Sequence, residues 1–379
     1  MTKVYISNVG MTKFGRWEEP LEILIEQAIN NFYQYDNSQK FDLNAIFFGA
    51  MNTDEFINAG NYSTVVADHL ALTPVPAVRI ETASSTGAAV FHMGVLAVAS
   101  GIYDNVLVIA GEKMTANDTP KTTEVLAKVI SDNERTYGAT MPALAALITQ
   151  RYMHDYGLSR DTLSEVAVKN HYNGSLNPFA HFQKEITVEK ASTSKFVAEP
   201  LRLFDCSPIS DGAAAVLLTS KPTDVNVAGI GQATDRMELR FRRSMTSFES
   251  TKKAAESAYK NSKLTPDQIS IAELHDAFTP FELISAEDVG FYKPGGAISA
   301  LEAGETELNG VRPINTSGGL KARGHPVGVS GLAQIIELVW QLRSEAGKRQ
   351  IDNVVSGLAQ STGGIANNNL VTILKKIDK

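Results

Sequence analysis

The sequence predicts an α/β fold in which helices cover the faces of buried sheets. Apolar runs of strand length alternate along the chain with segments of helical periodicity. The order of these segments also repeats weakly, which is typical of two similar halves that pack against each other. With 379 residues, of which 43% are hydrophobic, the chain is long enough to bury a large core.

The first half begins with a strand and then alternates between helices and strands. The expected elements are strands at Val4–Gly10, Ala45–Met51 and Asn105–Glu112, and helices at Leu21–Tyr35 and Gly87–Ser100. The last strand reads NVLVIAGE, and such a continuous apolar run is typical of a strand covered on both faces.

The second half repeats this order. The expected elements are strands at Val225–Gly231, Ile269–Phe278 and Asn353–Ala359, and helices at Ser250–Ser262 and Gly328–Ser344. We therefore predict an N-terminal half at residues 1–222 and a C-terminal half at residues 223–379.

Residues 115–195 interrupt the alternation of the first half. This segment mixes charge runs such as SDNERTYG with a helix that is expected at Met141–Tyr156. It is either a decorated surface insertion or a separate unit that covers a ligand.

The most informative motif is NTSGGLKARGHPVGVSG, which spans Asn315–Gly331. It places His325 in a glycine-dense turn that leads directly into a helix. Glycines allow backbone amides to approach a ligand closely, and a histidine at the mouth of a helix can exchange a proton with that ligand. A structural histidine in a tight turn is the alternative interpretation.

Four further motifs accompany this turn. They are KNHYNGSLNPFAHF at Lys169–Phe182, PLRLFDCSPISDGAAAVLL at Pro200–Leu218, ELHDAF at Glu273–Phe278 and LAQSTGG at Leu358–Gly364. With these motifs the chain resembles the thiolase superfamily, in particular the thiolases of the sterol-carrier-protein-2 and archaeal acetoacetyl-CoA type. The resemblance implies a five-layered αβαβα fold of two similar halves, with a loop domain at about residues 115–195 that covers the substrate.

The chain departs from this family at the positions of the reactive thiols. Where thiolases carry a nucleophilic cysteine, the segment ETASSTG has Ser84. The two places in which the family carries a second thiol hold Ser361 and Ala277. The single cysteine of the chain, Cys206, lies in a segment that is structural in the family, so the site is expected to contain no thiol.

Ser84 is expected at the N-terminus of a buried helix. The helix dipole and free amides would lower the pKa of a cysteine there from about 8.5 toward neutrality, but a serine hydroxyl is too weakly acidic to ionise. An ester-forming Ser84 would need a general base such as His325. We favour a hydroxyl that orients the substrate noncovalently, and an engineered replacement of a natural cysteine is the third interpretation.

The resemblance also implies roles for the polar groups of the site. His275 and His325 would surround the thioester carbonyl, and the backbone amides of Gly363 and Ser84 would form an oxyanion hole. Such preorganised donors contribute roughly 10²–10³-fold each to the rate of acyl transfer. Asp276 is expected to orient His275 or to cap the local backbone.

A basic segment, ELRFRRS, comes shortly before the helix expected at Ser250. Because CoA carries phosphates, Arg242 and Arg243 are candidate phosphate ligands, and Ser250 is a candidate for the pantetheine. A solvated basic cluster and an N-cap serine are the alternatives. CoA or an acyl-CoA is thus expected as substrate, with no tightly bound cofactor.

Composition argues against several other classes of protein. The net charge of −7 provides no basic stripe for a nucleic acid, and the histidines show no metal-ligand spacing with cysteines or carboxylates. There is no apolar run of transmembrane length. The single cysteine suits a reducing compartment, so we expect a cytoplasmic protein.

The resemblance implies an acyltransferase of the acetyl-CoA acetyltransferase type, which acts on acyl-CoA thioesters by Claisen or retro-Claisen chemistry. Because the thiols are absent, two alternatives stay open. One is an aldolase that cleaves a CoA-ester carbon–carbon bond without a covalent adduct, and the other is a non-catalytic CoA-ester-binding subunit of a complex. The resemblance further implies a homodimer or tetramer paired through the strand at Val78–Glu81, and a small partner protein with a zinc ribbon and an OB fold.

Overall fold

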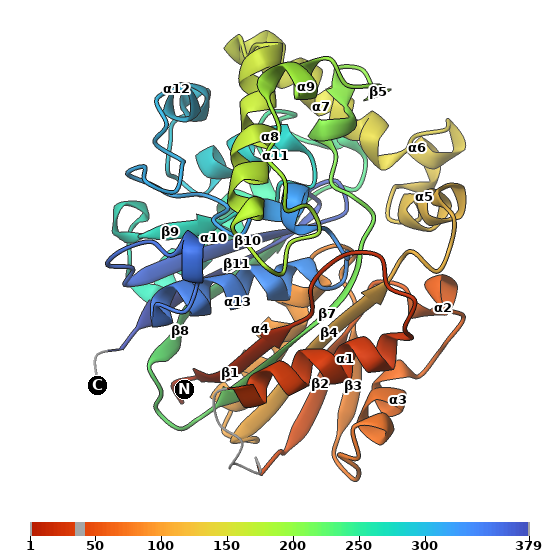
Figure 1. Ribbon diagram of the computed structural model, residues 1–379, viewed down its shortest axis with the longest axis vertical. Helices are drawn as coiled ribbons and strands as arrows, with labels where there is room; N and C mark the ends of the chain where they lie inside the picture. The colour runs from red at the N-terminus through yellow and green to blue at the C-terminus, as the bar shows by residue number, and fades with distance from the viewer. Residues whose placement is uncertain (1, 35–41, 378–379) are drawn as a thin grey trace.

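The computed structural model of the chain describes residues 2–34 and 42–377. Figure 1 shows the strands of the first half below those of the second half, with the helices of residues 119–192 above both. The strands of the first half are β1 (Tyr5–Met11), β2 (Ala45–Gly49), β3 (Ala77–Ile80), β4 (Asn105–Lys113) and β7 (Asp211–Thr219). Those of the second half are β8 (Val225–Thr234), β9 (Ile271–Glu273), β10 (Ser356–Gly363) and β11 (Asn368–Lys376).

The two halves have the same strand order. The first runs β3-β2-β4-β7-β1 and the second runs β9-β10-β11-β8, and the two groups join where Tyr5 pairs with Asn226. In the first half β2 pairs in parallel with β3 and β4, and the pairs β4–β7 and β7–β1 are antiparallel. In the second half β9 and β10 are parallel, and the pairs β10–β11 and β11–β8 are antiparallel. Ile314 forms a parallel bridge to Ala272 of β9, at the place that corresponds to β3. The repeat predicted from the sequence is therefore present in the topology.

Helices form three layers around these strands. In the central layer α4 (Thr86–Ala99) and α13 (Ser330–Arg343) pack against each other between the two groups of strands. The outer face of the first group is covered by α1 (Leu21–Asn30) and α3 (Tyr62–His69), and that of the second by α10 (Glu249–Ser262). This arrangement confirms the five-layered αβαβα fold.

Glycines let the two central helices begin side by side. A Cβ on Gly87 would lie 2.6 Å from the backbone nitrogen of Leu332, and a Cβ on Gly331 would lie 2.6 Å from that of Ala88. Any larger residue at either position would force the helices apart. The turn before α4 and the turn before α13 are thereby held close together.

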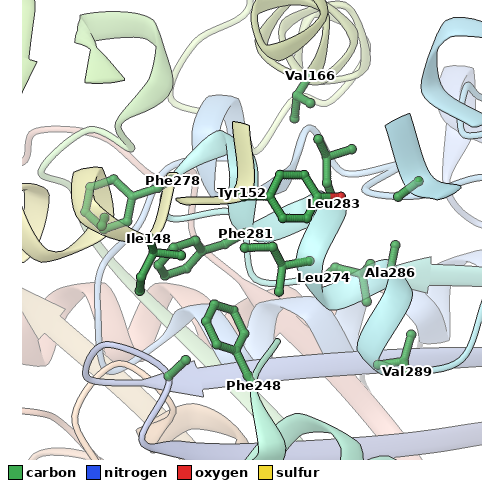
Figure 2. Close-up of a cluster of buried hydrophobic side chains, with 14 of the residues drawn as sticks. Ile148, Tyr152, Val166, Phe248, Leu274, Phe278, Phe281, Leu283, Ala286 and Val289 are labelled. Atoms are coloured by element: carbon green, nitrogen blue, oxygen red, sulfur yellow. The ribbon is translucent and has the colours of Figure 1, made fainter. Parts of the chain in front are cut away.

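The segment between β4 and β7 forms a unit of its own elements. They are α5 (Thr119–Ala127), α6 (Asp132–Thr136), α7 (Met141–Tyr156), α8 (Arg160–Ser175), α9 (Val188–Ser192), β5 (Phe196–Ala198) and β6 (Leu201–Arg202). Figure 2 shows Ile148 and Tyr152 of α7 beside Phe278 and Phe281, which come from the second half. The unit therefore shares a hydrophobic core with the C-terminal half, and this core holds α7 beside Phe278.

The remaining α-helices and a π-helical turn lie in connections. They are α2 (Thr53–Phe56), α11 (Thr279–Asp288), α12 (Gly296–Glu302) and a π-helical turn at Gly319–Arg323. In the part of the chain that the structure describes, no helix is both long and apolar enough to cross a membrane.

Two expected elements end five residues earlier than the sequence pattern indicated. The strand expected at Ile269–Phe278 ends at Glu273, because the amide of Leu274 donates to the side chain of Asn315 and that of His275 to Gln360. The helix expected at Leu21–Tyr35 ends at Asn30 and continues as a 3₁₀ turn to Gln34. Tyr35 itself lies outside the described residues.

Candidate active site

A cavity of about 190 Å³ brings together three of the sequence-predicted residues, Ser84, His275 and His325. Ser84 precedes α4, His325 precedes α13, and His275 follows β9. Since the two central helices begin side by side, the repeat of the fold places the first two residues at one end of the cavity. The loop after β9 adds the third.

The turn that carries Ser84 is tightly built. Ala83 has a left-handed φ of 55°, and the amides of Ser85 and Thr86 donate to the carbonyls of Thr82 and Ala83. The side chain of Ser84 is 8% exposed and borders the cavity. Its Oγ makes no hydrogen bond within the described residues, so the structure contains no Ser–His hydrogen bond that would activate this hydroxyl.

His325 is held as a neutral base. Ser330 Oγ donates to the carbonyl of Pro326 at 3.1 Å, and with its proton placed there it accepts the 2.7 Å hydrogen bond from Nδ1 of His325. This tautomer leaves Nε2 with a free lone pair. Burial, and then the nearby charge of Arg323, lower the pKa of His325 to about 3, so the ring stays unprotonated at neutral pH.

His275 lies against His325 in an edge-to-face contact. The ring centroids are 5.2 Å apart and the planes meet at 86°. Burial, followed by the charges of His325 and Arg323, lowers the pKa of His275 well below its usual value. Two neutral imidazoles thus face one cavity, where one can accept a proton and the other can donate a hydrogen bond.

Asp276 does not contact His275 through its carboxylate. It accepts hydrogen bonds from the amides of Leu320 and Lys321, and from Nδ2 of Asn170 at 2.8 Å. Of the two roles expected for it, the structure shows the backbone cap, which here supports the π-helical turn before His325.

Glu112, at the end of β4, is a site-supporting residue that the sequence analysis did not single out. Its buried carboxylate accepts the amide of Met51 at 2.7 Å, that of Asn52 at 3.3 Å and that of Gly328 at 3.0 Å. It therefore ties the turn of His325 to the cavity wall at Met51. Burial raises the pKa of Glu112 to about 7. The signal in the sequence was a charged residue at the end of the apolar run NVLVIAGE.

Neither Gly363 nor Ser361 of the C-terminal motif borders the cavity, but Gly363 packs beside it. A Cβ on Gly363 would lie 2.4 Å from the carbonyl oxygen of Thr82, so this glycine packs directly on the turn of Ser84. Ser361 is buried at 1% exposure, its Oγ has no partner among the described residues, and it does not border the cavity. From this strand end, Thr362 and Gly364 border the cavity instead.

The expectation that the site contains no thiol is wrong. Cys206 borders the same cavity as Ser84 and the two histidines. Burial raises the pKa of Cys206 to about 12, so the thiol stays protonated and is a poor nucleophile. The family position of this residue could not reveal that its segment folds back against the cavity.

The structure does not bring the three predicted CoA-binding residues to the cavity. The side chain of Arg242 donates to the carbonyls of Arg236 and Ile365, and Arg243 is exposed elsewhere on the surface. Ser250 Oγ donates to the carbonyl of Ala366 at 3.0 Å and accepts from Asn369. Arg242 and Ser250 thus have internal hydrogen-bonding roles.

A second, basic cavity of about 490 Å³ adjoins the first at residues 206–208. Lys184, Lys190 and Lys321 border it. His171 also borders it, stacks on Phe182 at 5.7 Å, and has a buried Nε2 without a partner in the described chain. Burial lowers the pKa of Lys321 to about 8. Cations and aromatic rings here suit an anionic ligand with a flat ring.

No group of three or more His, Cys, Asp or Glu side chains within residues 2–34 and 42–377 is arranged to hold a metal ion.

Comparisons with known proteins agree with this architecture. The family model for the thiolase N-terminal domain matches residues 4–222, and that for the thiolase C-terminal domain-like family matches residues 231–376. The chain belongs to the thiolase superfamily.

Among curated relatives, an acetyl-CoA acetyltransferase of Methanothermobacter thermautotrophicus is 40% identical, and the alignment covers 99% of this chain and 100% of the relative. The benzoylsuccinyl-CoA thiolase subunit BbsB of Thauera aromatica is 32% identical over 96% of this chain and 95% of its own. Among solved structures, an Ltp2-ChsH2(DUF35) aldolase superposes with a TM-score of 0.84 at 24% identity, covering 99% of this chain and 98% of that one. At 24% identity, the similarity to the aldolase structure shows a shared fold.

Proposed function

We propose that this thiolase-superfamily member is an acyltransferase of the acetyl-CoA acetyltransferase type that makes or breaks carbon–carbon bonds in acyl-CoA thioesters. The observation that carries the proposal is His325, which is bonded through Nδ1 to Ser330 and borders the cavity together with His275 and Ser84. The 40% identical relative, named acetyl-CoA acetyltransferase, supports the same class of chemistry.

In the bond-forming direction, His325 Nε2 removes a proton from the α-carbon of an acyl-CoA. The resulting enolate carbon attacks the thioester carbonyl of the second acyl unit, the carbon–sulfur bond breaks, and the CoA thiolate takes the proton back from His325. His275 stabilises the enolate oxygen by donating a hydrogen bond. The amides of Ser84 and Gly363 would hold the tetrahedral oxyanion.

A second candidate is the aldolase, which is favoured by the missing hydrogen bond between Ser84 Oγ and a base. Here His325 Nε2 removes the hydroxyl proton of a β-hydroxyacyl-CoA, the Cα–Cβ bond breaks, and a carbonyl compound leaves. The electron pair forms an enolate on the remaining acyl-CoA, which then takes the proton from His325. This cycle requires no nucleophile on the protein.

One experiment separates these functions. The protein is incubated with β-ketoacyl-CoA esters plus CoA, and separately with β-hydroxyacyl-CoA esters, while products and intact protein mass are followed. Thiolysis supports the acyltransferase, and cleavage of the hydroxy esters supports the aldolase. An acyl adduct that disappears in Ser84→Ala would assign Ser84 as nucleophile. If neither panel gives a product, the interpretation as a non-catalytic CoA-ester-binding subunit is favoured.

We also place the nucleotide of CoA at the basic cavity rather than at the arginines expected from the sequence. Lys190 is exposed there and lies 5.7 Å from the ring centre of Phe204, so phosphate and adenine have partners side by side.

Lys190→Ala should weaken binding of acetyl-CoA about tenfold in calorimetry, because a charge-assisted contact is lost. Arg243→Ala is the matched control, and equal effects of the two variants would contradict this placement.

Two assemblies belong to the proposal. β3 lies at the edge of the sheet, so its unpaired backbone groups can pair with a second copy of the chain. A small protein with a zinc ribbon and an OB fold is the proposed second partner. The names of the Ltp2-ChsH2(DUF35) aldolase and of the BbsB subunit support a complex of this kind. Copurification from the native host tests it.

A further inference from the structure

The wall of the reactive cavity combines a polar group of side chains with an apolar group, which we call its polar and apolar ends. Ser84, His275 and His325 occupy the first. The second is built by side chains from α5, α7, α11 and the connections beside them, namely Met114, Leu126, Val129, Met141, Phe281 and Val327. An acyl group whose thioester lies between the histidines would extend into this apolar end.

The apolar end offers nothing to a charged group. Among the described residues that border the cavity, none is Asp, Glu, Lys or Arg, and the two histidines are neutral. A carboxylate that enters such a site loses its hydration without gaining an ion pair or sufficient hydrogen bonds. The acyl group that fits must therefore be uncharged.

The volume of the cavity sets the size of that group. The whole cavity measures about 190 Å³, and the thioester and the acyl group share it. An apolar protein cavity of roughly 150 Å³ holds a benzene molecule, so there is room here for more than the single methyl of an acetyl group. Each buried methylene strengthens binding about fourfold, which gives longer acyl groups an advantage until the cavity is full. Met114 and Met141 can adjust their side chains to a straight chain or to a ring.

We propose that this cavity selects uncharged acyl groups of medium size, with about six carbons, over acetyl groups and over acyl groups that end in a carboxylate. The inference rests on the proposed CoA-ester function and adds the class of acyl group. Val129 and Met141, from the segment between β4 and β7, are the specificity-determining residues.

Binding of saturated acyl-CoAs tests the proposal without catalysis, because these esters lack the β-oxygen that carbon–carbon cleavage requires. Acetyl-, butanoyl-, hexanoyl- and adipoyl-CoA share the same CoA, so differences among their affinities report the acyl group. Calorimetry should show hexanoyl-CoA binding at least tenfold more tightly than acetyl-CoA and than adipoyl-CoA. Equal affinity for acetyl- and hexanoyl-CoA, or adipoyl-CoA binding as tightly as hexanoyl-CoA, would overturn the proposal.

A variant that fills the cavity locates the effect. Val129→Trp should remove the preference for hexanoyl-CoA while acetyl-CoA binds as before, and Leu147→Trp on the exposed face of α7 should change neither affinity. A preference that survives Val129→Trp would overturn the assignment to this end of the cavity. If the length dependence holds but neither substrate panel is turned over, the proposed catalysis fails and the acyl specificity stands.

Discussion

At the scale of single residues, the site depends on which groups are charged. Ser330 fixes the tautomer of His325, and burial keeps both cavity histidines neutral. The motif predicted that a histidine would be present, but its protonation could not be predicted, because it depends on burial by segments distant in sequence. Three predictions follow from these local environments.

Replacing His325 with alanine should abolish turnover and leave CoA-ester binding largely intact. Removal of a general base costs roughly 10²–10⁴-fold in rate, whereas the imidazole contributes little to ground-state affinity. Product formation on both substrate panels and calorimetry with acetyl-CoA check the two parts. Unchanged turnover would remove His325 from the mechanism.

The pH profile should lack the acid limb that a typical histidine produces. His325 acts as a base only when unprotonated, and since its pKa is lowered to about 3 it remains unprotonated as the pH falls from 8 to about 5. We expect kcat/KM to show no step from His325 over this range, and a step near 7, where Glu112 titrates, should be absent from Glu112→Gln. Folding is monitored by circular dichroism at each pH. A one-proton loss of kcat/KM with a midpoint near 6.5 that persists in Glu112→Gln would contradict this assignment.

Ser84→Cys should raise the thiolase activity. The side chain would stand at the start of α4, where the helix dipole and free amides favour a thiolate, beside the base His325. Faster thiolysis of acetoacetyl-CoA in the variant than in the parent is the expected result. Cys206→Ser in the same background is the control, because the protonated Cys206 should not contribute. A parent as fast as the variant would refute the view of Ser84 as a noncovalent hydroxyl.

At the scale of elements, the ends of strands and helices are tied together by buried side chains. Glu112, at the end of β4, accepts a hydrogen bond from Gly328 in the turn of His325. Gly87 and Gly331 let α4 and α13 begin in contact. The existence and order of these elements followed from periodicity. Their exact ends could not be predicted in this way, because side chains distant in sequence, such as Asn315, accept backbone amides that would otherwise continue the strand pairing.

Glu112→Gln should lower kcat more than it raises KM. A glutamine has a single acceptor oxygen, so it cannot receive the amides of Met51, Asn52 and Gly328 as the carboxylate does. The turn of His325 would then shift, and small displacements of a catalytic group cost up to about 10²-fold in rate. Glu124→Gln, on the exposed surface of α5, is the matched control. A variant with normal kcat would show that this carboxylate has only a structural role.

At the scale of the whole molecule, the duplicated fold explains why much of the site was predictable. The motifs of Ser84 and His325 precede corresponding helices of the two halves, so their approach follows from the repeat. Cys206 and Lys321 were missed because the walls they form arise where the segment between β4 and β7 meets the C-terminal half. Single motifs carry no information about such contacts.

The surface beside β3 gives the last prediction, a homodimer. β3 ends the sheet, Val78 on this strand is 45% exposed, and Met93 and Leu96 on the adjoining α4 are 45% and 48% exposed. Pairing of β3 with the same strand of a second copy would satisfy its free backbone groups and cover these side chains. Light scattering at micromolar concentration should therefore give at least twice the 41.0 kDa of one chain.

Leu96→Glu should shift the protein to the single chain, because it would bury an unpaired charge at the interface, whereas Val311→Glu on a distant exposed loop should not. A parent that is monomeric, or a Leu96→Glu variant that still pairs, would exclude this surface as the interface.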